Sequence, residues 1–106
     1  MGDEYKKFPA RLKKAMDVRG IRAVDLSIRT GIPKSTISRY LKGDFYPKSK
    51  SLGIITSELG VSGAWLMGYG DDDDMFDSVK DKVKSIIDTM SDEDISKLLK
   101  LIELIK

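Results

Sequence analysis

Apolar residues recur at intervals of three and four along most of the chain, which is the spacing of one face of an α-helix. Within the first 68 residues, glycines interrupt this pattern at intervals of about ten, and a glycine just past a helix readily adopts the left-handed conformation that ends it. No strand pattern is convincing. The spacing therefore predicts an all-α fold with five helices, over residues 9–19, 23–30, 34–42, 49–59 and 62–67.

The stretch GYGDDDDMFD, residues 68–77, interrupts the helical pattern. Its four consecutive aspartates repel one another, which favours an extended, solvated linker. A calcium loop is the alternative, but the alternating ligands and closing glutamate of an EF-hand are missing. The sequence thus predicts a first domain over 1–68, an acidic linker over 69–76 and a C-terminal helical segment over 77–106.

Two helices are expected after the linker, the first capped by Asp77 or Ser78 and the second by Ser91. The second has a broader apolar stripe than one neighbouring helix would cover. We expect it to pack against the first, over 77–90, on one side and a second copy of the chain on the other. The dimerisation residues would be Leu98, Leu101, Leu104 and Ile105. The alternative is that both helices fold back on the first five within a monomer.

The composition and the charge distribution limit the classes of function that the protein can have. The 106 residues include neither cysteine nor histidine, which removes disulfides, Cys/His metal sites and the usual general base. No apolar run is long enough to span a membrane, so we expect a cytoplasmic protein. Because the sequence also has no glycine-rich phosphate loop and no convincing carboxylate pair, we expect neither enzymatic activity nor a cofactor. Residues 1–68 carry 13 basic against 6 acidic residues, whereas residues 69–106 carry 6 lysines against 11 acidic residues. This asymmetry favours an anionic partner for the first part.

The stretch TGIPKSTISRYLKG, residues 30–43, predicts a tight turn between two helices, because Gly31 ends the first and Pro33 biases the preceding residue towards extended backbone. Two short helices joined by such a turn form a helix-turn-helix. The second helix should bury Ile37, Tyr40 and Leu41.

The opposite face of that helix carries hydroxyls and Arg39 but no acidic residue. Arg39 can donate two parallel hydrogen bonds to a guanine, and the hydroxyls can bond base edges, so the face suits DNA. An ordinary solvated helix face is the alternative, and this stretch by itself does not separate the two.

From Phe8 to Gly68 the chain resembles the Xre-type, phage-repressor helix-turn-helix family, through FPARLKKAMDVRG, LSIRTGIPKSTISRYLKG, DFYPKSKSL and LGVSGAWLMG. The resemblance implies a five-helix bundle whose third helix enters the major groove of DNA. By position, the base-reading residues would be Lys34, Ser35, Thr36, Ser38 and Arg39. The residues that contact backbone phosphates would be Lys42, Lys48, Ser49 and Lys50.

Two positions depart from the family pattern. Ala23 stands where the family has a glutamine that bonds a phosphate, and we expect Arg22 to supply that contact. Ser27 replaces the small residue, usually alanine, that packs between the two helices. Its hydroxyl is expected to bond a carbonyl one turn back along its own helix.

Together these features predict a sequence-specific DNA-binding transcriptional regulator, of the phage or mobile-element repressor kind, that acts by occupying an operator. The double-stranded operator is expected to be an inverted repeat bound by a homodimer joined through the C-terminal helices. An antirepressor or other protein could release it. The alternative is an antitoxin-like protein that neutralises a partner protein and regulates its own synthesis through DNA binding.

Overall fold

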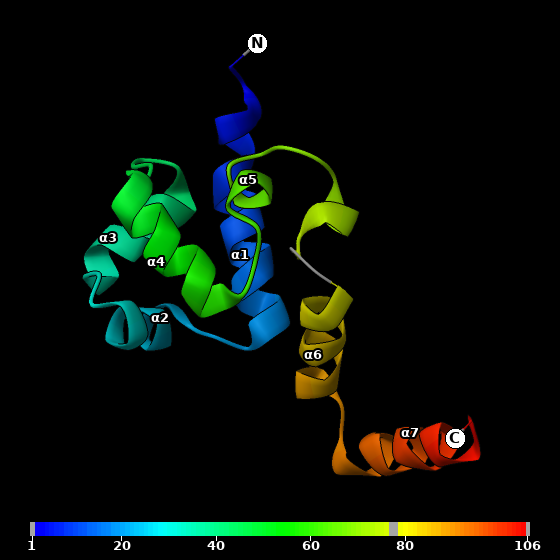
Figure 1. The fold of residues 1–106 in the computed structure, drawn as a ribbon. Coiled ribbons are helices and arrows are strands. Elements are labelled where there is room, and N and C mark those ends of the chain that lie inside the picture. The colour runs from blue at the N-terminus through cyan, green and yellow to red at the C-terminus, as the bar shows by residue number, and fades with distance from the viewer. Residues whose placement is uncertain (1, 77–78, 106) are drawn as a thin grey trace.

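The computed structural model describes residues 2–76 and 79–105, and the described chain is all-α, as the apolar spacing predicts (Figure 1). A 3-10 helix, η1 (Glu4–Lys7), leads into the bundle, and a second, η2 (Asp72–Asp74), follows it. The five helices expected before Gly68 are confirmed, and no end moves by more than one residue. In chain order the α-helices are α1 (Phe8–Arg19), α2 (Ala23–Thr30), α3 (Lys34–Lys42), α4 (Ser49–Leu59), α5 (Gly63–Leu66), α6 (Val79–Thr89) and α7 (Asp92–Ile105).

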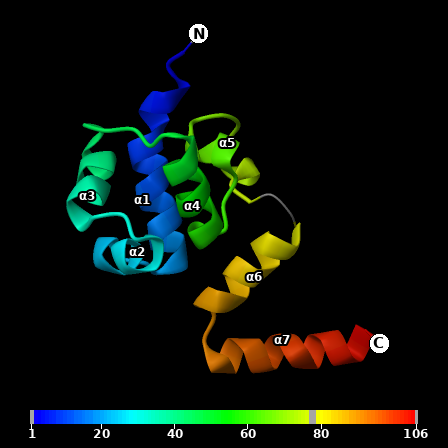
Figure 2. The same cartoon turned by 60° about the vertical axis from the view of Figure 1, so that its left-hand side comes forward.

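Helix α1 is the centre of the bundle and packs against α3, α4 and α5 (Figure 2). Its buried side chains, Phe8, Leu12, Ala15 and Met16, follow the spacing of three and four. Trp65 of α5 is fully buried in the same core, so its expected role as an anchor is confirmed. The hydrophobic contacts of α1 thus hold the helix-turn-helix and the end of the bundle in one core.

Gly68 ends the bundle in a conformation that only glycine tolerates. Its φ is +107°, and a Cβ atom would overlap the carbonyl group of Glu4, which covers it from η1. The N-terminal segment and the end of the bundle therefore meet at this glycine, and both lie over α1 (Figure 1).

The acidic segment after the bundle is not the extended chain that the sequence predicted. Asp72–Asp74 form η2, whose carboxylates are exposed as expected, but Met75 is only 3% exposed and belongs to the core. The backbone N–H of Ser62 donates to the Met75 carbonyl at 2.7 Å, and the Lys14 ammonium lies 2.6 Å from Asp72 Oδ2. Buried apolar surface and an ion pair to α1 therefore outweigh the repulsion between the aspartates.

The first helix of the C-terminal tail docks on the bundle. Helix α6 packs against α1, Ser85 is buried, and Arg19 Nη1 lies 3.2 Å from Asp88 Oδ2. This contact matches half of the monomer alternative, in which both tail helices fold back.

Helix α7 neither packs along α6, as predicted, nor folds back on the bundle, as in the monomer alternative. It leaves the end of α6 at an angle and projects away from the bundle, so it does not lie along α6 as predicted (Figures 1 and 2). Met90 and Ser91 connect the two helices without reversing the direction of the chain. Ser91 caps α7 as expected, since Asp94 N donates to its Oγ at 3.2 Å, whereas Asp77 and Ser78 lie outside the described residues.

Candidate nucleic-acid interface

The turn between α2 and α3 is fixed by its own hydrogen bonds. Gly31 has φ +77°, and its N–H donates to the Ser27 carbonyl at 2.9 Å. The Ser27 hydroxyl donates to the carbonyl of Ile32 at 2.6 Å. The prediction that it would bond one turn back was wrong, because the turn brings an otherwise unpaired carbonyl closer. Thr30 Oγ1 accepts from Ile32 N at 3.2 Å, so both hydroxyls of α2 hold the start of α3.

Helix α3 separates a buried face from a solvent face. Ile37 and Tyr40 are buried and Leu41 is half-buried, as predicted. The candidate base-reading residues lie on the solvent side, where Lys34, Ser35 and Arg39 are exposed and Thr36 and Ser38 are half-buried. The helix contains no acidic residue, and its last turn carries Arg39 and Lys42. The structure thus brings the five predicted residues onto one short helix that presents positive charge and hydroxyls.

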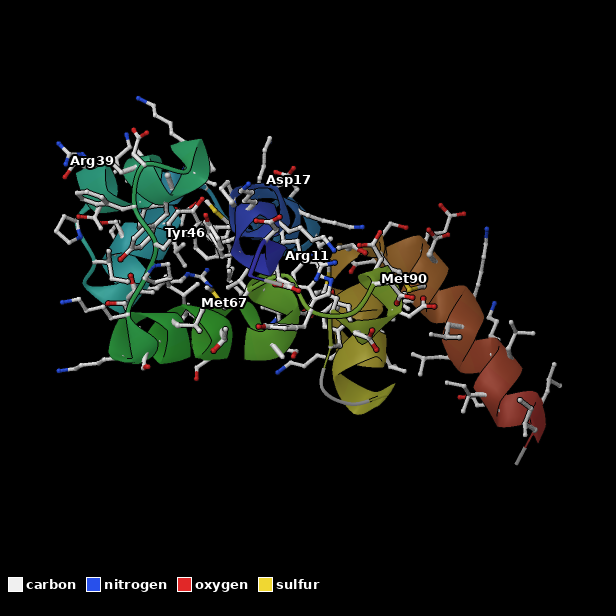
Figure 3. The ribbon with its side chains drawn as sticks, turned by 90° about the horizontal axis from the view of Figure 1, so that it is seen from above. Arg11, Asp17, Arg39, Tyr46, Met67 and Met90 are labelled. Atoms are coloured by element: carbon white, nitrogen blue, oxygen red, sulfur yellow. The ribbon has the colours of Figure 1, made fainter. Side chains whose placement is uncertain are left out.

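Arg39 has a neighbour that the sequence reasoning missed. Its Cζ atom lies 4.8 Å from the centroid of the Phe45 ring, and this ring is 45% exposed. Among the described residues, Arg39 makes no ion pair with a carboxylate. In Figure 3 the side chain lies at the outer edge of the molecule, far from α7. Its hydrogen-bond donors therefore stay available to a ligand.

The candidate phosphate residues surround the end of α3 and the start of α4. Lys42, Lys48, Ser49 and Lys50 are all exposed. Tyr46 between them packs edge-on against Tyr5, with 5.1 Å between ring centroids, and also contacts Phe8. This aromatic contact ties the loop to α1, so the basic residues stand on a loop with a fixed path.

Arg22, the remaining candidate, is exposed but already has a partner. Its backbone N–H and its Nε both donate to Asp25 Oδ2, at 3.1 and 3.2 Å. These hydrogen bonds hold the pKa of the Asp25 carboxyl below its ordinary value. The pair starts α2 and orients the arginine, and it also offsets part of the positive charge that a phosphate would meet.

The candidate dimerisation residues are distributed around α7. Leu98 is half-buried, whereas Leu101, Leu104 and Ile105 are exposed, at 58%, 82% and 84%. The exposed apolar surface extends further than predicted, because it includes Leu99 and Ile102 of α7 and Val83, Ile86 and Ile87 of α6. No residue of α7 is buried among those described. We call these exposed apolar side chains of α6 and α7, together with Leu98, the tail surface.

The comparisons with known proteins agree with this geometry. Residues 11–61 match the model of the Cro/C1-type HTH DNA-binding domain, which includes the whole helix-turn-helix. A 26 kDa repressor protein of Escherichia phage HK022 is 34% identical over 74 residues, which cover 66% of this chain and 32% of the phage protein. The chain thus spans about a third of the length of that relative.

A solved structure shares the fold. The crystal structure of a transcriptional regulator from Listeria innocua superposes with a TM-score of 0.54 at 18% identity, covering 92% of this chain and 91% of that one. None of the described helices has the length and apolar character needed to cross a membrane. The match of residues 11–61 and the geometry of α2 and α3 confirm the resemblance to Cro/C1-type, Xre-like helix-turn-helix DNA-binding domains.

Proposed function

We propose that this protein is a sequence-specific transcriptional repressor, of the phage or mobile-element kind, which acts by occupying a DNA operator without chemistry of its own. The observation that carries the proposal is the solvent face of α3. It presents an arginine without an ion-pair partner among the described residues, a lysine and three hydroxyl side chains on one short helix. The similarity to the phage HK022 repressor protein supports repression over activation.

Direct reading of the bases is assigned to α3. The Arg39 guanidinium can donate two parallel hydrogen bonds to O6 and N7 of a guanine, and one such pair discriminates against a wrong base by about 1–3 kcal/mol. Lys34 at the first turn can reach a neighbouring guanine or a phosphate. Ser35, Thr36 and Ser38 contribute hydroxyls to base edges.

Lysines around the base-reading helix are assigned to the phosphate backbone. Lys42 ends α3, and Lys48, Ser49 and Lys50 follow it closely in sequence; all four are exposed. Each lysine that neutralises a phosphate releases counterions, so these contacts supply affinity that falls with salt and does not depend on sequence. Arg22 adds a weaker contact, because Asp25 already shares its charge.

We further propose that two copies associate through the tail surface. A folded monomer of 11.9 kDa exposes about 5,900 Å² by the usual scaling with mass, whereas this chain exposes 7246 Å². The excess, about 1,300 Å², exceeds the roughly 800 Å² that one partner contributes to a standard interface. The radius of gyration, 15.7 Å, likewise exceeds the value of about 13 Å for a compact domain of this length. A symmetric dimer would bind an inverted repeat with half-sites about 34 Å apart.

Selection from a random pool of double-stranded DNA by the full chain tests the proposal. We expect an inverted repeat to be enriched, and the mass of the complex should correspond to two chains per site. Arg39→Ala should weaken binding to the selected site by about 1–3 kcal/mol and relax the preference at one base pair per half-site.

Lys50→Ala is the matched control for the backbone contacts. It should weaken selected and random DNA alike and reduce the slope of log affinity against log salt by about one. If the two variants lose the same affinity on both DNAs, the division into base and phosphate contacts is wrong. If no sequence is enriched, the repressor proposal fails. If a sequence is enriched but the chain co-purifies with a small basic protein that occupies the tail, the antitoxin-like alternative replaces the repressor proposal.

A further inference from the structure

The packing of the core does not explain why the ring of Phe45 is exposed. Phe8, the other phenylalanine of the bundle, is fully buried, whereas Phe45 stands in the loop after α3 with 45% of its surface exposed. Leaving a phenylalanine in water forgoes the stabilisation that burial would bring. What the ring does contact is the guanidinium of Arg39, 4.8 Å from its centroid.

The backbone brings these two residues together. Gly43 ends α3 with φ +81°, and the chain then turns back over the last turn of the helix. Asp44 N donates to the Arg39 carbonyl at 2.9 Å, and Phe45 N approaches the same oxygen at 3.4 Å. The two side chains in contact therefore belong to residues whose main chains are also hydrogen-bonded, so the turn itself brings them together.

A contact with the face of the Phe45 ring leaves the N–H donors of the Arg39 guanidinium free to bind a ligand. An aromatic ring interacts with the flat face of a guanidinium, whereas the N–H donors point outward within its plane. A carboxylate neighbour would instead have occupied the same donors that a guanine needs, and none pairs with Arg39 in the described part of the chain. The ring can thus restrict the side chain without consuming its hydrogen bonds.

We propose that Phe45 is a positioning residue for base recognition, which holds the Arg39 guanidinium in the orientation that reads a guanine. The proposal rests on the repressor function assigned above. A free arginine samples many rotamers, and part of its binding free energy is lost when one of them is selected. The ring makes that selection before DNA arrives, so its effect should be confined to DNA that Arg39 reads.

The test is a double-mutant cycle with the full chain on the sequence that it selects from a random pool. Phe45→Leu keeps an apolar side chain and removes the ring. It should weaken binding to the selected site about two- to fivefold, the range expected for one exposed cation–π contact, and leave random DNA unaffected. In the background of Arg39→Ala, the same change should cause no further loss.

Two further variants separate positioning from stability. Phe45→Tyr keeps the ring and should bind the selected site within about twofold of the wild type. Tyr69→Leu removes an exposed ring that follows α5 and should change neither affinity nor base preference. Thermal melting of each variant shows whether the fold is intact.

The outcomes are distinguishable. Additive losses from Phe45→Leu and Arg39→Ala would mean that the ring contacts DNA itself, and would overturn the proposal. Equal losses from Phe45→Leu and Phe45→Tyr, or an equal loss on random DNA, would do the same. If Arg39→Ala keeps full affinity and base preference, the assigned base-reading role fails as well. If Arg39→Ala loses its preference while Phe45→Leu is neutral, only the positioning role is wrong.

Discussion

Removing the Arg11 side chain should show how firmly the acidic segment is bound to the bundle. The guanidinium of Arg11 on α1 donates to three backbone carbonyls, one in α5 and two in the segment that follows it. They are Trp65 O at 2.7 Å, Tyr69 O at 2.9 Å and Gly70 O at 2.7 Å. The same group lies over the Trp65 ring, 5.1 Å from its centroid. One side chain thus joins α1 to the start of the segment that leads to the tail.

The magnitude follows from the exposure of each contact. The bond to the Trp65 carbonyl is partly buried, and a bond to a charged donor in such a place contributes about 1.5–3 kcal/mol. The bonds to Tyr69 and Gly70 are exposed, so water replaces them and each contributes a few tenths of a kcal/mol at most. The cation–π contact adds about 0.5–1 kcal/mol. Arg11→Met should therefore destabilise the protein by about 2–4 kcal/mol.

Urea denaturation followed by circular dichroism measures this loss, which should lower the melting temperature by about 10 °C or more. Lys13→Met is a matched control on the same helix, because its ion pair with Asp17 is exposed on both sides and should contribute less than about 0.5 kcal/mol. Hydrogen exchange should also become faster between Tyr69 and Met75. Equal stability of the two variants would refute the assigned role of Arg11.

Two other outcomes follow from the structure. Because Arg22 lowers the pKa of Asp25, the stabilisation it supplies should be complete above the ordinary value of 3.8 and disappear as pH falls through the lowered value. Asp25→Asn should thus be less stable than the wild type at neutral pH and converge with it in acid, which urea titrations at several pH values would detect. A chain ending at Phe76 should stay folded, become monomeric by light scattering and lose most operator affinity while keeping its base preference. Full affinity in that chain would mean that the tail serves another partner.

The bundle was predictable because its signals are local. Apolar spacing and helix-ending glycines lie within a few residues of what they determine, so α1 to α5 could be placed closely from the sequence. The same spacing predicts which face of α3 is exposed once Ile37 is assigned to the core, whereas the choice of the five base-reading residues on that helix came from the resemblance to the family. The division into domains and the roles of these residues stay predictions.

The acidic segment was misjudged because its structure depends on distant residues. Four aspartates in a row indicate a solvated chain, and the local pattern offers only Met75 and Phe76 against that interpretation. The stabilising contacts come from Arg11 and Lys14, more than fifty residues earlier in the chain. Phe45 was missed for a related reason, since aromatic residues in a loop carry no periodic signal and the partner of Phe45 becomes apparent only when the turn is built.

The contacts of the acidic segment and of α6 also change how the charge asymmetry between residues 1–68 and 69–106 is interpreted. The surplus of basic residues before Gly68 predicts an anionic partner, but not every basic side chain is available to it. On α1, Arg11 is held by backbone carbonyls, Lys14 pairs with Asp72, and Arg19 pairs with Asp88. Residues beyond the bundle thus contact three of the four basic side chains of α1.

The lysines around α3 and α4 remain exposed, and Arg39 lies at the end of the molecule away from α7 (Figure 3). Aspartates of the acidic segment and Asp88 of α6 would repel phosphates that approached α1, whereas α3 carries no carboxylate of its own. By pairing with Lys14 and Arg19 of α1, Asp72 and Asp88 would leave the positive charge concentrated around the helix that is proposed to read the bases, which would favour approach of DNA in the productive orientation.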